Sequence, residues 1–291
     1  MTQTTPATAN NTGLASKALL ANLNISQSSG RKHDKKVTRE IEEAHNAQHG
    51  EAGRFNKMLT SKEFLAGIMK TAGAARQYLY ENTLPWGDNG DRLLPSANYF
   101  DFIAGMQKFD RDFYAEVDKA ENTFSEMLIE AQKRLNGLFS PADYPNIIEF
   151  RSKFNFKTCF MPIPETADLR LDINQTEVNV LRQSIESEMN NRLTEAVSDT
   201  WSRIKDQLTK MKETLSDKDK IFRDSLFNNL KDIIALLPKL NVTNDSNIND
   251  ICNEMQTLLV NPDEVRTNTM LRSKKAQEVN DLLNKFDSFF S

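Results

Sequence analysis

The chain has 291 residues, of which 37 are Lys or Arg and 41 are Asp or Glu, so the net charge is −4. This balance argues against a protein dominated by nucleic-acid electrostatics, while the length allows one large domain or two smaller ones. All ten glycines lie at or before Gly137, and His49 is the last of three histidines. The remaining half of the sequence therefore lacks the residues of a glycine-rich phosphate loop and of a histidine-based triad.

The two cysteines, Cys159 and Cys252, lie far apart in the sequence and form no C-x-x-C motif. Two isolated cysteines fit a reducing cytoplasm better than a disulfide framework, so we expect a cytoplasmic protein. No apolar run approaches the length of a membrane span, and we expect no membrane contact. The sequence leaves open whether the chain forms homo-oligomers.

The first 60 residues predict a tail, a strand and a charged arm. Residues 1–16 are polar and rich in Thr, Asn and Ala, which is typical of a disordered tail. Alternating apolar residues predict a short strand at 19–25, within the segment 17–60. The rest of this segment is a polar arm, basic and then acidic, that is either a solvated helix or a mobile arm.

A basic run opens the arm and is a candidate contact for nucleic-acid phosphates. Three glutamates follow at once and would partly cancel its charge, and no aromatic residue is interleaved to stack on bases. We therefore predict at most weak, sequence-independent binding. The candidate contacts are Arg31, Lys32, Lys35, Lys36 and Arg39.

Residues 61–291 predict a helical bundle with a small β cap. An amphipathic helix begins near Ser61, and a loop rich in Pro and Gly follows at 85–95. Two long helices, at about 98–136 and 176–215, place apolar residues at alternating three- and four-residue spacings. Each would be about 55 Å long, so the fold we expect is mostly α, an elongated bundle.

Three shorter amphipathic helices should follow the second long helix. Their expected ranges are 218–237, ending before Pro238, then 248–259 and 261–289. Trp201 continues the apolar stripe of the second long helix, so we predict a core residue rather than an anchor for a partner.

A small β element is predicted near 154–173, between the two long helices. Alternation predicts strands at 154–160 and 169–173, and with the strand at 19–25 they would form a small sheet. A small sheet leaves unpaired edges, so a partner could dock here, unless the element only ties the two helices together. The candidate partner contacts are Phe154, Phe156, Phe160 and Ile163.

No motif carries recognisable catalytic chemistry. His45 and His49 have a spacing that can bind metal, but the zinc-protease pattern needs Glu where Asn46 stands. Catalytic zinc also needs three protein ligands, so solvated histidines are the better interpretation. The carboxylates at 110–118 alternate with basic residues, as on a solvated helix face. We predict no enzyme, no catalytic residue, no metal and no cofactor.

Three stretches of the sequence carry a resemblance to a known family. The first is Leu19–Ser26 leading to Arg31-Lys32. The second runs from Tyr144-Pro145 through Phe150–Phe154 to Pro162–Pro164 and Leu169–Leu171. The third runs from Phe222–Leu230 to Leu237–Asn241. Together they resemble the domain-of-unknown-function family 3150 of phages and mobile elements, and the resemblance would cover residues 17–290.

This resemblance implies a genomic neighbourhood rather than a reaction. Members of that family are often encoded near a MoxR-type AAA+ ATPase, similar to the cobalt-chelatase small subunit, and near a von Willebrand A-type protein. The implied role is an adaptor that works with such an ATPase, without catalytic residues of its own. The alternative is a nucleic-acid-handling accessory protein that uses the basic arm at 31–39. Membrane insertion of the β element is disfavoured, because charges such as Lys157 would be costly in lipid.

Overall fold

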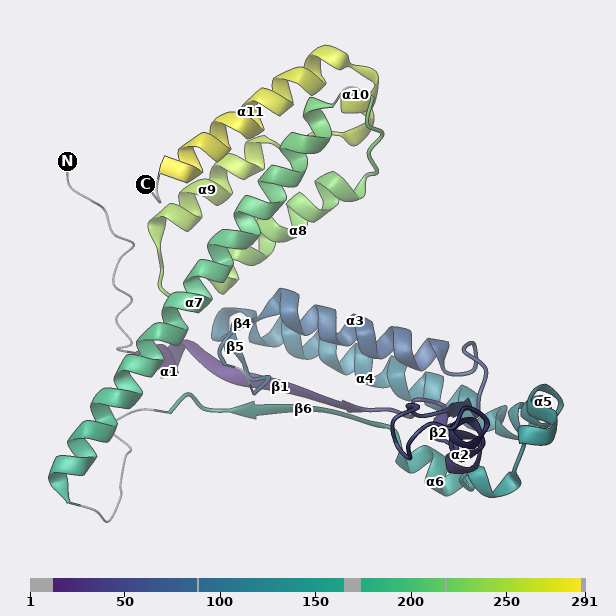
Figure 1. Cartoon of the computed structure of the whole chain (residues 1–291). Helices are drawn as coiled ribbons and strands as arrows, with labels where there is room; N and C mark the ends of the chain where they lie inside the picture. The colour runs from purple at the N-terminus through teal and green to yellow at the C-terminus, as the bar shows by residue number, and fades with distance from the viewer. Residues whose placement is uncertain (1–12, 88, 165–173, 218, 289–291) are drawn as a thin grey trace. The chain divides into compact units, whose positions relative to one another are not determined.

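The computed structural model describes residues 13–87, 89–164, 174–217 and 219–288 (Figure 1). They are mostly helical, with eleven α-helices and two small antiparallel sheets. Packing divides the chain into two compact units. Unit 1 comprises Met1–Asn22, Tyr80–Phe102 and Phe160–Ser291, and unit 2 comprises Leu23–Leu79 and Ile103–Cys159. The mostly α class with a small β element is confirmed, but the helices are divided between two units rather than gathered in one clear bundle.

The tail, predicted to span residues 1–16, falls largely on residues 1–12, which lie outside the described residues. After Gly13 the chain forms the short helix α1 (Leu14–Lys17), and the side chain of Leu14 is buried. None of the helices in the described ranges combines the length and the hydropathy needed to cross a membrane.

The main sheet has the strand order β4-β5-β1-β6. β1 (Ala18–Ser26) confirms the strand predicted at 19–25, and β6 (Asn155–Met161) confirms the strand predicted at 154–160. The second strand of the predicted β element, at 169–173, lies outside the described residues.

The prediction of a loop at 85–95 is wrong, because this segment forms a β-hairpin. β4 (Leu84–Pro85) pairs antiparallel with β5 (Arg92–Pro95), which in turn pairs with β1. Leu84 and Leu93 face each other in this pairing and are fully buried. Gly87 and Gly90 mark only the turn, Pro85 and Pro95 lie in the two strands, and the apolar segments are too short to signal a strand by alternation.

The first long helix, predicted at 98–136, is broken into α4 (Tyr99–Asn122) and α5 (Phe124–Leu135). At the break, Thr123 has φ −100° and ψ 10°. Its hydroxyl donates to the carbonyl of Lys119 at 3.0 Å, a side-chain bond that often bends helices. The apolar spacing continues across the break, so periodicity alone could not reveal it.

Within unit 2, the helix expected from Ser61 is α3 (Ala66–Asn82), whose buried residues are Ile68, Ala72, Ala75 and Leu79, while Met69 is 45% exposed. α3 runs beside α4 (Figure 1). Tyr78 packs on Phe109 at 5.4 Å between ring centres, and a Cβ at Gly105 would lie 2.3 Å from the Tyr78 ring. α6 (Ile147–Ser152) adds an aromatic cluster to this unit through Phe150.

Within unit 1, the second long helix predicted at 176–215 is confirmed as α7 (Gln175–Ser216). Its second half packs with α8 (Ser225–Leu240), α9 (Ser246–Thr257) and α11 (Thr269–Ser288), as Figure 1 shows. The core prediction for Trp201 is confirmed, because its side chain is 6% exposed and packs on Phe286 at 5.5 Å between ring centres.

Two boundaries predicted in unit 1 are wrong. α8 begins at Ser225 rather than at 218, and it continues past Pro238, which lacks the N–H for an i→i−4 bond, to end two residues later at Leu240. The last helix, predicted at 261–289, is divided at Asn268 into α10 (Pro262–Thr267) and α11. Asn268 leaves the helical region with φ −113° and ψ 99°, and its side chain accepts from the Leu271 N–H. Asn268 is a favoured N-cap residue, so the sequence does contain a signal for this division. The prediction missed it because the apolar periodicity continues through it.

Candidate functional site

The charged arm folds around a small two-stranded sheet in unit 2. β2 (Arg31–His33) pairs antiparallel with β3 (Asn56–Met58), and α2 (Lys35–Ala44) lies between them in sequence. Gly30 precedes β2 with φ +64°, and a Cβ there would lie 2.3 Å from the hydroxyl of Thr60, so only glycine fits. We left open whether the arm is a solvated helix or a mobile arm, and the structure contains the helix, α2. The pairing of β2 with β3 holds the two ends of the arm together.

A buried lysine that sequence analysis missed fastens the arm. The side chain of Lys57 is 5% exposed. Its ammonium group contacts Asp34 Oδ2 at 2.8 Å, Asp143 Oδ2 at 2.5 Å and the Leu138 carbonyl oxygen at 2.9 Å. We call these four residues the Lys57 knot. Since a buried charge is tolerated only when paired and hydrogen-bonded, the knot joins the arm to the segment after α5.

The knot shifts the acidity of its members. Burial disfavours the charged form of Lys57, but the contacts with Asp143 and Asp34 outweigh burial and raise the pKa of Lys57. The hydrogen bond from Lys57 lowers the pKa of Asp34, aided by the backbone N–H groups of Val37 and Lys36 that Asp34 caps at the start of α2. Burial opposes ionisation of Asp143, yet Lys57 and Lys32 lower its pKa overall. The knot is therefore built from charged groups.

The five basic candidates for nucleic-acid contact do not form a free basic surface. Lys32 pairs with Asp143 at 2.9 Å, and Lys36 lies 3.8 Å from Glu40. Arg31, Lys35 and Arg39 are exposed. Two of the five positive charges are thus opposed by carboxylates, Lys36 by Glu40 of the acidic run that we expected to cancel charge, and Lys32 by the distant Asp143, which the sequence did not indicate.

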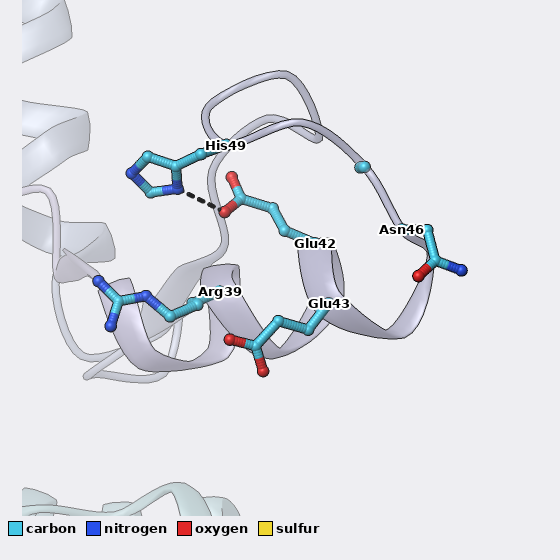
Figure 2. Close-up of a pocket in the computed structure, with 6 residues that line it drawn as sticks. Arg39, Glu42, Glu43, Asn46 and His49 are labelled. Atoms are coloured by element: carbon cyan, nitrogen blue, oxygen red, sulfur yellow. Dashed lines mark hydrogen bonds and ion pairs between the residues drawn. The ribbon is translucent and has the colours of Figure 1, made fainter.

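A hollow of about 490 Å³ lies at the end of α2 (Figure 2). Within it, the buried carboxylate of Glu42 accepts from the Gly50 N–H at 2.7 Å and from His49 Nδ1 at 2.8 Å. These two hydrogen bonds lower the pKa of Glu42. Glu42 therefore closes the loop after α2, and the remaining lining residues are Arg39, Glu43, Asn46 and Ala47.

The hollow has one feature of acid–base sites, a carboxylate that orients an imidazole. His49 donates through Nδ1, which leaves Nε2 of the neutral ring as an acceptor. However, none of the six lining residues is a Ser, Thr or Cys that this pair could activate. His45 does not line the hollow, and no group of three His, Cys, Asp or Glu in the described ranges could hold a metal ion.

The aromatic residues predicted as partner contacts lie mostly inside the protein. Phe154, Phe156 and Ile163 are at most 7% exposed, while Phe160 is half-buried and packs on Tyr99. The N–H of Phe156 also donates to the Tyr114 hydroxyl at 3.3 Å. A partner would therefore meet other residues of this element, because the protein's own residues cover these side chains.

Four large apolar side chains that the sequence analysis did not single out are strongly exposed. They are Ile221 at 94%, Phe100 and Met270 at 83%, and Ile148 at 79%. Scattered apolar residues are normal on protein surfaces, so exposure by itself is not informative. Ile221 and Met270 differ from Phe100 and Ile148 in one respect. The segment that carries Ile221 and the helix that carries Met270 are joined by the hydrogen bonds of one buried side chain.

That side chain is Arg272, in the first turns of α11. It is 8% exposed and donates to the carbonyls of Thr214, Leu215, Asp217 and Lys220, where α7 ends. Arg266 similarly donates to the Phe222 carbonyl at 3.2 Å, and both guanidinium groups lie over the Phe222 ring. The backbone carbonyls of Lys220 and Phe222, on either side of Ile221, are thereby hydrogen-bonded, while the Ile221 side chain is exposed. We call Ile221 and Met270 the apolar end of unit 1.

Comparison with models of protein families, with curated proteins and with solved structures gave no match to this chain. Three features therefore stand as candidates on their geometry: the Glu42–His49 hollow, the exposed side of the arm, and the apolar end. The hollow offers acid–base groups without a nucleophile, and the arm offers partly neutralised charge. The apolar end offers two exposed apolar side chains on segments that the buried Arg272 and the more exposed Arg266 hold together.

Proposed function

We propose that this protein is a non-enzymatic adaptor that binds a protein partner through the apolar end of unit 1. The main observation in support is that Ile221 is 94% exposed, although Arg272 and Arg266 bind the backbone carbonyls on either side of it. A backbone segment that is already fixed loses little conformational entropy on binding, so more of the burial energy of Ile221 contributes to affinity. Binding energy at interfaces is concentrated in a few central residues, and that is the role we assign to Ile221 and Met270.

The candidate partner is a MoxR-type AAA+ ATPase, and it comes from the resemblance to the phage and mobile-element family. The sequence supports a division of labour, because no G-x-x-x-x-G-K-[ST] motif occurs in it. Nucleotide hydrolysis would then belong to the partner, and this chain would dock on it. A von Willebrand A-type protein is the second candidate partner on the same ground.

A nucleic-acid-handling role through the arm is the second candidate function. Arg31, Lys35 and Arg39 support it, because they are exposed on one short segment. The carboxylates that oppose Lys32 and Lys36 reduce the local positive charge. Since each phosphate contact adds to the salt dependence of binding, three charges would give weak and salt-sensitive affinity.

The test is to mix the purified protein with a purified MoxR-type AAA+ ATPase, the kind of partner that the resemblance implies, and to measure complex formation and ATP turnover. The double variant Ile221→Asp, Met270→Asp should weaken the complex at least about tenfold, because a charge enters an apolar contact. Ile148→Asp is the matched control, since Ile148 is also strongly exposed but belongs to unit 2. This control should bind as the unmodified protein does.

Two results would contradict the adaptor proposal. Absence of a complex together with unchanged ATP turnover would remove it and move the nucleic-acid role to first place. A complex that both double and control variants form equally well would place the contact elsewhere on the protein. Salt-sensitive binding to nucleic acid that Arg31→Glu and Lys35→Glu abolish would support the second candidate function.

A further inference from the structure

The connection after α5 holds an Asn-Gly pair in an uncommon backbone conformation. Asn136 has φ +44° and ψ −116°, which is the geometry of the first central position of a type II′ turn. Glycine normally occupies that position, because a side chain there is strained. Asn136 and Gly137 are both exposed, and the space around Gly137 is open, since an added Cβ would meet nothing within 4 Å.

This value of ψ brings the next backbone nitrogen towards the side chain. In an L residue, Cβ is offset from the residue's own nitrogen by about 120° around the Cα–C bond. At ψ −116° the nitrogen of Gly137 therefore nearly eclipses Cβ of Asn136. A five-membered ring that contains this nitrogen, the backbone carbonyl carbon, Cα, Cβ and Cγ requires that eclipsed arrangement. Extended and helical residues are far from it.

We propose that Asn136 is a site of spontaneous deamidation and isomerisation for which the fold supplies the reactive backbone geometry. The Gly137 nitrogen loses its proton to water or hydroxide and attacks Cγ of Asn136, which forms the N–Cγ bond. The Cγ–Nδ2 bond then breaks, and ammonia leaves with the proton that it requires. The product is a cyclic imide, and the step is neither an oxidation nor a reduction.

Water then opens the imide at either of its two carbonyl carbons. Attack at Cγ gives an aspartate in a normal backbone, while attack at the backbone carbonyl carbon gives an isoaspartyl link that runs through Cγ. The net change is water consumed, ammonia released and one negative charge gained. Prior alignment of reacting atoms is what accelerates such intramolecular steps.

The site adjoins the Lys57 knot. The carbonyl of Leu138, two residues on, accepts from the Lys57 ammonium at 2.9 Å. An isoaspartyl link lengthens the main chain just before that carbonyl, and either product adds a negative charge at the C-terminal end of α5, where the helix dipole disfavours it. The modified protein should therefore hold the arm less firmly than the original protein does.

The experiment compares the folded protein with the same chain unfolded in urea, both incubated at mildly alkaline pH. Peptide mass spectrometry follows the mass gain at residue 136, and heavy-oxygen water labels the entering oxygen. Folding normally restricts the backbone and slows this reaction. We expect instead that the folded protein is modified at Asn136 several-fold faster than the unfolded chain.

Asn89-Gly90 is the internal reference, because it is the other Asn-Gly pair of the sequence and should react at a similar rate when the chain is unfolded. Gly137→Ala should slow modification at 136 by roughly tenfold, since the added methyl hinders attack by the nitrogen while fitting the open space. If folding protects Asn136, or if Gly137→Ala reacts as fast as the original folded protein, the proposal is wrong.

Discussion

Lys57 is the residue at which local sequence is least informative. Its neighbours Asn56 and Met58 give no sign of burial, yet its side chain is 5% exposed and contacts oxygens of Asp34, Asp143 and Leu138. Those partners lie up to 86 residues away along the chain. Only a fold that brings them together makes a buried ammonium tolerable, since desolvation of an unpaired charge is very unfavourable.

Replacing this lysine should therefore be strongly destabilising. Lys57→Met keeps the unbranched apolar stem of the side chain but leaves Asp34 and Asp143 in a mostly buried site without their shared counter-charge, and we expect a loss of about 3–5 kcal/mol in unfolding free energy. Urea denaturation followed by circular dichroism measures it. Lys32→Met is the control, because Lys32 is 46% exposed and its pair with Asp143 should contribute at most about 1 kcal/mol. Equal effects of the two changes would show that burial of Lys57 is unimportant.

At the scale of elements, the arm consists of the paired strands β2 and β3 and of the helix α2 between them in sequence. Its attachment to the segment after α5 depends on ionised groups. The knot joins β3 to the start of α2 through Asp34 and to the segment after α5 through Asp143 and Leu138. Because lysine and carboxylates must be charged to attract each other, the attachment of the arm is a function of pH.

The direction of the pH effect follows from the shifted pKa values. Asp34 and Asp143 have lowered pKa values, so their contribution is complete above the ordinary aspartate pKa of about 4 and is lost as pH falls through the lowered values. Lys57 has a raised pKa, so its contribution is complete below about pH 10 and is lost only as pH rises through the raised value. We expect the stability difference between the original protein and Asp143→Asn to shrink below about pH 4. A difference that is constant between pH 7 and pH 2 would contradict this.

At the scale of the whole molecule, each of the two units buries apolar residues of its own. Unit 1 buries both tryptophans of the sequence in two separate apolar clusters, Trp86 at 1% exposure in one and Trp201 at 6% exposure in the other. The Lys57 knot belongs entirely to unit 2. Units with separate cores can unfold in separate transitions, which a single two-state description would not capture.

Tryptophan fluorescence should therefore report on unit 1 alone. In Lys57→Met we expect the urea midpoint seen by circular dichroism to fall in part, while the midpoint seen by tryptophan fluorescence stays unchanged. The reason is that the substitution removes contacts only from unit 2. Trp201→Ala is the reciprocal control, with near-ultraviolet dichroism of Trp86 following unit 1. If both probes shift together in Lys57→Met, the two units form one cooperative structure.

The sequence by itself determined the elements whose signals are local and repeated. The stripe of α7 could be found because a 3.6-residue period persists over more than ten turns, and β1 and β6 could be found because apolar residues alternate. The burial of Trp201 followed from the same stripe. Such patterns record which face of an element meets the core, and they do so without reference to distant residues.

Only the folded structure shows where the helices break and where the sites lie. The backbone leaves the helical region at Thr123 and at Asn268, and the apolar period continues past both residues. The Lys57 knot, the Glu42–His49 pair and the arginine-ordered apolar end each depend on where particular donors and acceptors lie after folding. Asn136-Gly137 is visible as a dipeptide, but its reactivity depends on a ψ angle of −116° that the surrounding fold imposes. Hydrogen bonds and backbone angles at single residues have no period along the chain, so only folding reveals them.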